Sequence, residues 1–537
     1  MVRAFIMKNL FTRFLPVWTA ITLYLVTGFL LLRFYQYQIN PDGISYINNA
    51  RLILQGQFLL SVNDHWNPLI SWLLAPFLVT GLTPQLAFKG MNLLIGAGGF
   101  ILLHVWLERW QITGWIRWLV LFTLMPMLLW MAFAVLSPDL LVALCLMLYL
   151  SILHHPAYFD KRCNAVLLGL VAGLSYLAKY YALPFIAVHL FAYHALAYHY
   201  ERPNKRRRIW RHYAMAMLVF CGIVVSWLML QSAKYADRGG LGNHMSSYVF
   251  AFLNPHASSD PFGRAGLVPP PHASATSAWD DPRSIPVESW YPWQSPQDAA
   301  AYINIVRGFF SYMLGVVGQF TPFAWGIFLI FLYFGMSNTS TILPRKESWK
   351  WLLPFLIYAF GYLLIWVEER YLWFLNILLL FMVLQLFVAW PPARRTRALH
   401  AILVITLLSF AYFPGEKLVH YFHQDQAIHD LAARLDLGDA KREISIASNK
   451  HWVESLYICY YRNWRYYGSN ARYVREELVR AALAEHQIDG FLFWGERPAG
   501  KYAFLNNYPD LTQGRIDGVH LFQLEKRQPS SSQFHHP

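Results

Sequence analysis

Long apolar stretches recur along most of this chain, and short basic segments separate many of them. A helix needs about 20 mainly apolar residues to cross a hydrocarbon core of about 30 Å. The stretches are continuous and do not alternate with polar residues, so they predict spanning helices and exclude a β-barrel. We expect about eleven spans. They lie near residues 15–35, 86–108, 116–136, 138–154, 163–180, 182–199, 212–232, 306–334, 351–367, 371–390 and 398–414. The pattern therefore predicts a mainly α, polytopic transmembrane bundle.

Positive charge divides the connecting segments into two sets. The 537 residues carry a formal net charge of +14, and Lys and Arg cluster in alternate segments between the spans. This distribution is typical of membrane topology, so we expect no nucleic-acid partner. The positive-inside rule places the basic side, with the N-terminus, in the cytoplasm. Segments 36–85 and 233–305, and the chain after about residue 413, are then external.

The two ends of the chain differ in character. The basic N-terminus leads into an apolar run that is long enough to span and has no small-residue cleavage site, which predicts an uncleaved first helix. After the bundle, expected over 1–414, strand-like and helix-like segments alternate and predict a small external α/β domain over 415–528. The segments are REISIASN (442–449), 451–459, 474–486, IDGFLFWG (488–495) and GVHLFQLEK (518–526). The polar tail 529–537 is expected to be disordered.

The first external segment contains two short amphipathic stretches. PDGISYINNARLILQG, which begins at Pro41, predicts an interfacial helix with Asp42 at its N-terminal end. NDHWNPLISWLLAPFL (63–78) predicts a surface or re-entrant helix anchored by Trp66 and Trp72. Asp42 can be read as a helix N-cap or as a catalytic carboxylate.

Further ionisable residues recur at the external ends of the predicted spans. Asp139 follows Ser137 and Pro138, Lys179 ends a span, and Glu368, Glu369 and Arg370 lie between two apolar helices. Each has a structural alternative: Asp139 can cap a helix, Lys179 can snorkel, and Glu369 and Arg370 can form a structural ion pair. Charges at membrane depth are costly, so their convergence on one face indicates function.

Five motifs together resemble the GT-C superfamily of membrane glycosyltransferases. The similarity is to the bacterial family 39 type, which is related to protein mannosyltransferases and lipid A aminoarabinose transferases. The motifs are PDGISYINNARLILQG, NDHWNPLISWLLAPF, SPDLLVALCLMLYL (137–150), AGLSYLAKYYALP (172–184) and EERYLWFLNILLL (368–380). The resemblance implies a polyprenyl-phosphate-linked sugar as donor and inverting transfer at the external face of the bacterial inner membrane. The acceptor would be a hydroxyl of a glycan, lipid or protein.

Residue roles also follow from the resemblance. Asp42 matches the acidic residue that acts as base toward the acceptor. The cavity and the donor phosphate are assigned to Asp139, Lys179, Glu369, Arg370 and Tyr46. The sequence has Asp-Gly at 42–43 where the mannosyltransferase pattern has two adjacent acids, which weakens the case for protein O-mannosylation.

Aromatic and acidic residues of the external loops supply the remaining candidates. Asp64 and His65 are a possible second acidic element or metal-ligand pair, so dependence on a divalent metal stays open. In the Gly-, Pro- and Ser-rich loop 233–305, Trp279, Trp290 and Trp293 can stack on sugars or anchor the loop at the membrane. Trp66 is a further candidate for contact with the acceptor.

Two other classes of protein remain as alternatives. A transporter or flippase of lipid-linked or sugar substrates would also be polytopic, but such proteins tend to place charges at the membrane midplane and to show internal repeats. Here the charges lie at helix ends, and no convincing repeat is visible. A structural or partner-binding protein would leave Asp42 replaceable.

Overall fold

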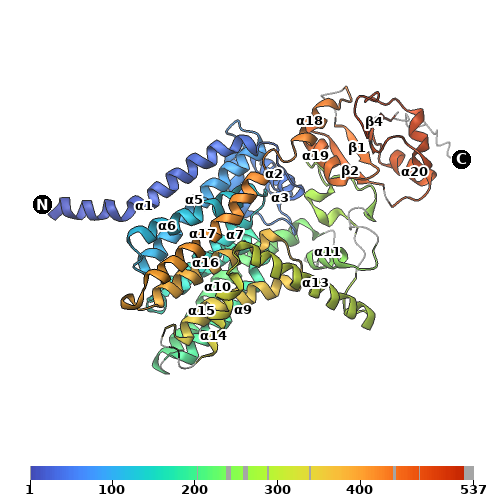
Figure 1. Ribbon diagram of the computed structural model, residues 1–537. Coiled ribbons are helices and arrows are strands. Elements are labelled where there is room, and N and C mark those ends of the chain that lie inside the picture. Colours follow the sequence, from blue (N-terminus) through green and yellow to red (C-terminus); the bar gives the residue numbers. More distant parts are fainter. Residues whose placement is uncertain are drawn as a thin grey trace. The chain divides into compact units, whose positions relative to one another are not determined.

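The computed structural model describes residues 2–201, 203–236, 244–257, 264–286, 290–337, 340, 342–438, 443–470 and 472–524. The chain forms two compact units (Figure 1). Unit 1 comprises Met1–Gln36, Asn67–Leu241 and Ser295–Phe422, and unit 2 comprises Tyr37–Trp66, Gly242–Gln294 and His423–Pro537. The sheet-bearing unit therefore also holds two segments from earlier in the chain, and a domain boundary at residue 414 stays a prediction.

Unit 1 is a bundle of helices. Its longer helices are α1 (Val2–Leu31), α5 (Pro84–Arg109), α6 (Gly114–Phe133), α7 (Asp139–Leu153), α8 (Arg162–Ala178), α9 (Ala182–Tyr200), α10 (Pro203–Lys234), α13 (Pro296–Phe320), α14 (Ala324–Met336), α15 (Arg345–Leu363), α16 (Trp373–Ala389) and α17 (Arg397–His420). Short elements join them: α4 (Leu69–Leu74), η1 (Leu32–Phe34), η2 (Ala75–Phe77), η3 (Tyr158–Asp160), η7 (Glu369–Leu372) and η8 (Pro392–Arg394). Seven of the described helical segments are long and apolar enough to cross a membrane, and shorter apolar helices accompany them.

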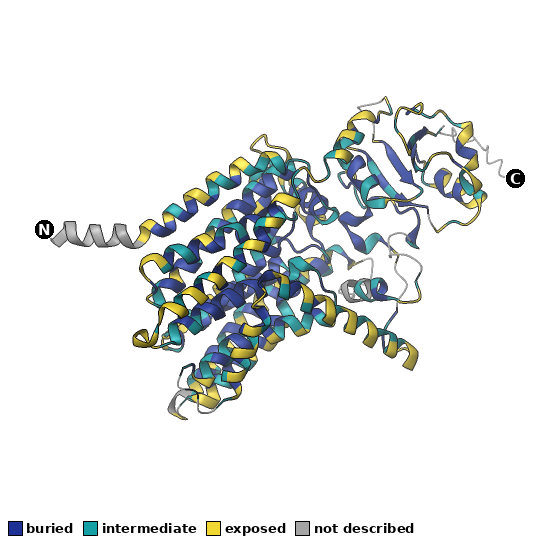
Figure 2. Cartoon of the chain, in the orientation of Figure 1, coloured by how far each residue is buried: buried dark blue, intermediate teal, exposed yellow. Residues whose placement is uncertain are grey.

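Burial distinguishes inner from outer helices of this bundle (Figure 2). In the most apolar stretch of the segment Glu369–Ala389, which contains α16, 78% of the residues are buried, against 22% in Arg206–Lys234 of α10. Large apolar side chains of α10 such as Leu218 and Met229 are 74% and 66% exposed. Exposed apolar surface on this scale is unfavourable in water and suits contact with lipid. The chain is therefore an integral membrane protein.

One predicted span is divided in the structure. The stretch 306–334 forms two helices, α13 and α14, that are separated at Thr321, whose backbone is extended. Pro322 follows Thr321, and a proline disfavours the helical conformation of the residue before it. The Thr321 hydroxyl lies 2.6 Å from that of Ser409 on α17, so the break is held by a side-chain hydrogen bond.

The helix predicted over 63–78 is confirmed from Leu69 onward and wrong over its first residues. Only α4 and the short η2 turn are helical there, and residues 62–68 form an irregular segment that ends at Pro68. Trp66 is 6% exposed, so it is a packed residue of unit 2 and not a membrane anchor. The reason is tertiary: the Trp66 indole donates to a carbonyl oxygen of another segment of the same unit.

Unit 2 contains a four-stranded sheet flanked by short helices. The strands are β1 (Ser445–Ser448), β2 (Arg465–Ser469), β3 (Gly490–Trp494) and β4 (Val519–Gln523), in the order β2-β1-β3-β4. β1 pairs in parallel with β2 and β3, and β4 is antiparallel to β3. The helical elements are α2 (Pro41–Leu54), α3 (Phe58–Ser61), α11 (His244–Leu253), η5 (Ala278–Asp280), η6 (Pro282–Ser284), α18 (Gln426–Arg434), α19 (Trp452–Arg462), α20 (Glu476–Glu485) and η9 (Gly500–Asn507). The predicted mainly α bundle with a small α/β part is confirmed, although the sequence analysis missed β2.

The described part of the long loop packs on this sheet. The Val268 amide donates to the Tyr467 carbonyl at 2.7 Å, and the Tyr466 amide donates to the Thr276 carbonyl at 2.7 Å. Leu267 lies in the same hydrophobic core as Phe491 of β3. The loop thus continues the sheet beyond β2 and brings residues 276–284 beside α2 within one unit.

Candidate functional site

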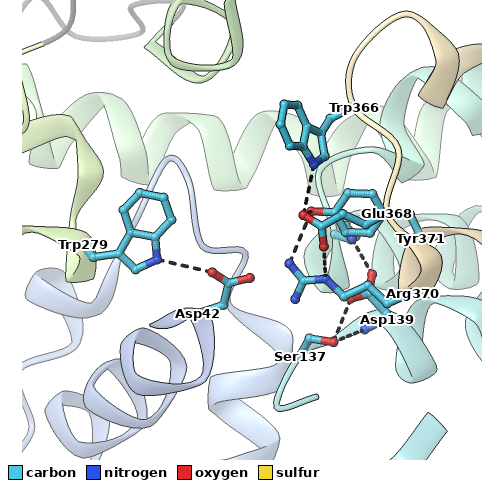
Figure 3. A network of polar contacts seen from close by, with 9 residues as sticks. Asp42, Ser137, Asp139, Trp279, Trp366, Glu368, Arg370 and Tyr371 are labelled. Carbon is cyan, nitrogen blue, oxygen red and sulfur yellow. Dashed lines mark hydrogen bonds and ion pairs between the residues drawn. The ribbon is translucent and has the colours of Figure 1, made fainter. Parts of the chain in front are cut away.

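Asp42 lies in the first turn of α2. Asn40 occupies the N-cap position and Pro41 the first helical position, so the N-cap reading of Asp42 is wrong. The free N–H groups of a helix N-terminus favour a negative side chain there. Asp42 Oδ1 accepts a hydrogen bond of 3.3 Å from the indole N–H of Trp279 (Figure 3). The candidate base therefore has a defined partner, Trp279, from the loop 233–305, which we expected to contact the acceptor.

Trp279 is itself held in place by an aromatic and polar cluster. Its carbonyl accepts from the Trp66 indole at 2.9 Å and from the Ser45 hydroxyl at 3.1 Å. The Trp66 ring meets Trp279 edge-on at 5.7 Å, and Tyr46 meets Trp66 at 5.4 Å. His65 lies 4.4 Å from the Trp66 ring. Tyr46, His65 and Trp66 are thus packed around the partner of Asp42.

Asp280 is a residue of this cluster that the sequence analysis did not identify. Its side chain is buried and accepts hydrogen bonds from the Asn48 amide (2.9 Å), the Thr276 N–H (2.7 Å) and the Ser45 hydroxyl (3.2 Å). Burial raises the pKa of Asp280 to about 6, and the hydrogen bonds oppose this shift only in part. Asp280 joins η5 to α2 and so fixes Trp279 relative to Asp42. The adjacent acids Asp280 and Asp281 after a tryptophan were the only sequence signal.

Asp64 forms a mostly buried ion pair. Arg283 Nη1 lies 2.9 Å from Asp64 Oδ2, and the two side chains are 7% and 10% exposed. Among the described residues, no group of three or more His, Cys, Asp or Glu side chains is arranged to hold a metal ion. The structure therefore gives Asp64 a partner other than a metal, and dependence on a metal stays a prediction.

The other two candidate tryptophans differ in exposure. Trp290 is 4% exposed and packs edge-on to Phe250, whereas Trp293 is 72% exposed and stacks on Tyr291 at 5.1 Å. Of this pair, Trp293 has the ring surface that a sugar could reach. Sugar stacking by either residue stays a prediction.

A second cluster of charges lies in unit 1. Asp139 begins α7, Lys179 follows α8 in extended conformation, and Arg370 lies in η7. The Lys179 ammonium donates to Asp139 Oδ1, and Arg370 Nε lies 3.7 Å from Asp139 Oδ2. The Ser137 hydroxyl donates to the same Oδ2 at 2.7 Å (Figure 3). Three predicted site residues from three distant segments therefore meet.

The cations of this cluster are more accessible than their shared acid. The side chains of Lys179 and Arg370 are 20% and 16% exposed, whereas that of Asp139 is 4% exposed. The Lys179 ammonium also lies 3.5 Å from the centre of the Tyr371 ring, a cation–π contact. Lys179 is thus fixed by an acid and a ring and does not simply snorkel.

The sequence left open an ion pair between Glu369 and Arg370, and this prediction is wrong. Arg370 Nε pairs with Glu368 at 2.7 Å, and Glu369 lies 3.7 Å from Lys417 of α17. In the 3-10 turn η7, adjacent side chains point in different directions, so neighbouring charges take different partners. Lys417 had no role in the sequence analysis, because it lies in another helix.

Solved structures offer a comparison for the fold. A crystal structure of ArnT from Cupriavidus metallidurans bound to undecaprenyl phosphate matches 93% of this chain and 97% of that chain, with a TM-score of 0.54 and 13% identity. The oligosaccharyltransferase of Archaeoglobus fulgidus, in complex with Zn and sulfate, matches 90% of this chain and 68% of that chain, with a TM-score of 0.51 and 10% identity. No protein-family profile and no curated protein sequence matches the chain significantly. At these identities the likeness is one of fold.

Proposed function

We propose that this chain, which has the GT-C fold, is a membrane glycosyltransferase that moves a sugar from a polyprenyl-phosphate-linked donor to a hydroxyl acceptor. The observation that carries the proposal is the pair of partly exposed cations, Lys179 and Arg370, that flank the buried Asp139. Two cations at one point suit a phosphate leaving group. The matching ArnT structure contains undecaprenyl phosphate, which supports this class of donor.

The proposed reaction needs a base for the acceptor and positive charge for the leaving phosphate. The acceptor oxygen attacks the anomeric carbon, its proton passes to the Asp42 carboxylate, and a new glycosidic bond forms. The bond between the anomeric carbon and the phosphate oxygen breaks, and the phosphate leaves with the electron pair. Lys179 and Arg370 stabilise the negative charge of the released lipid phosphate. Attack on the side opposite the phosphate inverts the anomeric centre.

The hydrogen bond from Trp279 supports the assignment of Asp42 as the base. An indole N–H is a neutral donor, so it orients the carboxylate without placing a positive charge beside it. Asp64, in contrast, is mostly buried and pairs with a cation at 2.9 Å. We therefore assign the base to Asp42 and a structural role to Asp64. The loop charges support an external face for this chemistry.

The function is tested by Asp42→Asn in cells that depend on this protein. Lipid-linked sugars and mature glycans are compared by mass spectrometry in cells with the wild type, with the variant and without the protein. We expect Asp42→Asn to retain wild-type membrane levels and to lose transfer by at least about 100-fold, the range for general base catalysis. Asp517→Asn, at an exposed position of the same unit, is the matched control.

Two results would contradict the proposal. Sustained transfer by Asp42→Asn would remove Asp42 as the base. A lipid-linked sugar that accumulates unchanged on one side of the membrane, with no glycosidic bond formed by the wild type, would instead identify a transporter or flippase.

A further inference from the structure

A cavity of about 480 Å³ lies in unit 1 among helix ends that the proposed chemistry does not use. It is lined by the C-terminal ends of α5, α7 and α9 and by the N-terminal end of α15. Asp139 begins α7, whereas this cavity lies beyond its last residue, Leu153, about 20 Å away at 1.5 Å per residue. The cavity is therefore separate from the Lys179 and Arg370 cluster.

Two polar atoms in the wall are buried without a partner among the described residues. They are the indole N–H of Trp106, whose side chain is nearly inaccessible, and Nε2 of His154. Leaving a buried donor unsatisfied costs about 1–3 kcal/mol, so native structures retain such groups mostly for a reason. Both residues line the same cavity, although the two atoms themselves are covered. A ligand with acceptor oxygens that shifts the rings slightly gives the Trp106 N–H a partner, and gives His154 Nε2 one in the tautomer that carries its proton there.

The charged groups of the wall favour an anionic ligand. Arg109 has no carboxylate partner in the described part of the chain; its guanidinium donates to the Ser151 carbonyl at 2.6 Å and lies 5.3 Å from the Trp106 ring centre. Lys350 and Lys346 also line the cavity, each paired with a glutamate at 2.7 Å and 2.9 Å. Arg109 thus leaves one positive charge in the wall that no acid offsets.

The aromatic walls are packed against one another. Trp106 lies 5.4 Å from Trp351, and His154 stacks on Tyr193 at 5.5 Å and contacts Trp351 at 5.3 Å. Such a cluster holds its donors in fixed directions and excludes water, which strengthens hydrogen bonds to an anion.

We propose that this cavity binds a phosphate-type oxyanion, as a lipid headgroup or as a free phosphate. Phosphate oxygens accept from the Trp106 indole and from the imidazole of His154, and the Arg109 guanidinium balances their charge. The aromatic rings contact the apolar part of the molecule that carries the phosphate. The loop charges place this site on the cytoplasmic side, opposite the proposed transfer. The site does not depend on the proposed function.

The proposal is tested with the purified full chain and two phosphate probes. Binding of inorganic phosphate is measured by equilibrium dialysis in detergent, and binding of phosphatidic acid by native mass spectrometry from nanodiscs with and without this lipid. Trp106→Phe keeps an aromatic side chain and removes the N–H donor, so we expect about tenfold weaker binding. We expect a similar loss for Arg109→Gln. Trp115→Phe, at an exposed position of α6, should bind as the wild type does.

The outcomes identify the source of the phosphate and also decide whether the proposal holds. Binding of phosphatidic acid alone identifies a lipid headgroup site, binding of inorganic phosphate alone identifies a soluble ligand, and binding of both identifies the phosphate as the shared determinant. Trp106→Phe also loses packing of a buried ring, so Arg109→Gln, which removes a partly exposed cation, is the variant that separates lost binding from lost stability. Absence of binding, or equal binding by the wild type, Trp106→Phe and Arg109→Gln, overturns the proposal.

Discussion

The buried carboxylate of Asp280 gives a quantitative test of how the Asp42 and Trp279 pair is held. Asp280→Asn preserves the shape of the side chain. Its amide oxygen can replace Oδ2, which accepts from Asn48 and from the Thr276 N–H. Its NH₂ group can replace Oδ1 and donate to the Ser45 hydroxyl, which still donates to the Trp279 carbonyl. The substitution thus removes a buried charge and keeps the hydrogen bonds.

The expected magnitude follows from the pKa. Burial raises the pKa of Asp280 from 3.8 to about 6, so the folded protein binds this proton more tightly than the unfolded chain does. The wild type therefore loses stability as the pH rises from about 4 to about 6. At 1.36 kcal/mol per pKa unit, the loss is about 3 kcal/mol. Asp280→Asn lacks this loss, so it should match the wild type near pH 4 and exceed it by up to about 3 kcal/mol at pH 7.5.

Thermal unfolding of the purified full chain in detergent measures this difference. Melting temperatures of the wild type and Asp280→Asn are recorded from pH 4 to pH 8 at constant ionic strength. We expect the two curves to separate between pH 4 and pH 6, and Asp280→Asn to melt roughly 5 °C higher at pH 7.5. Asp517→Asn, at an exposed position of the same unit, should follow the wild type at every pH.

A difference in melting temperature between Asp280→Asn and the wild type that does not change with pH would refute the titration of Asp280. A lower melting temperature of Asp280→Asn at pH 7.5 would refute the reasoning more broadly. It would mean that the ionised carboxylate stabilises unit 2 despite its burial, because the hydrogen bonds to the charge outweigh the desolvation.

Two further substitutions test the ion pairs. The double variant Lys179→Gln with Asp139→Asn removes one charge of each sign, so it should insert and fold. We expect it to lose sugar transfer at least tenfold, because the leaving phosphate loses a cation. Normal transfer would exclude Lys179 from the phosphate site. Arg283→Met removes the cation that pairs with the buried Asp64 and should destabilise unit 2 by about 3–5 kcal/mol in thermal unfolding. Arg480→Met breaks an exposed pair and should cost less than about 1 kcal/mol, and equal effects of the two would contradict the role of burial.

The sequence by itself determined the membrane character, most helices and the α/β nature of the C-terminal part. These features depend on local patterns: apolar runs long enough to span, and alternating strand-like and helix-like segments. It also identified Asp42, Asp139, Lys179 and Arg370 as candidates, because charges beside spanning helices are rare. The break before Pro322 could have been foreseen from the proline alone.

Only the tertiary structure decided which groups these candidates meet. Asp42 and its partner Trp279 are 237 residues apart, and Asp139 meets Lys179 and Arg370 from other helices. Arg370 pairs with Glu368 and not with Glu369, and the buried Asp280 connects η5 to α2. Side-chain direction and packing set these partners. Such contacts leave no local period or spacing in the chain, so the chemistry of the site was visible in its residue types but its geometry was not.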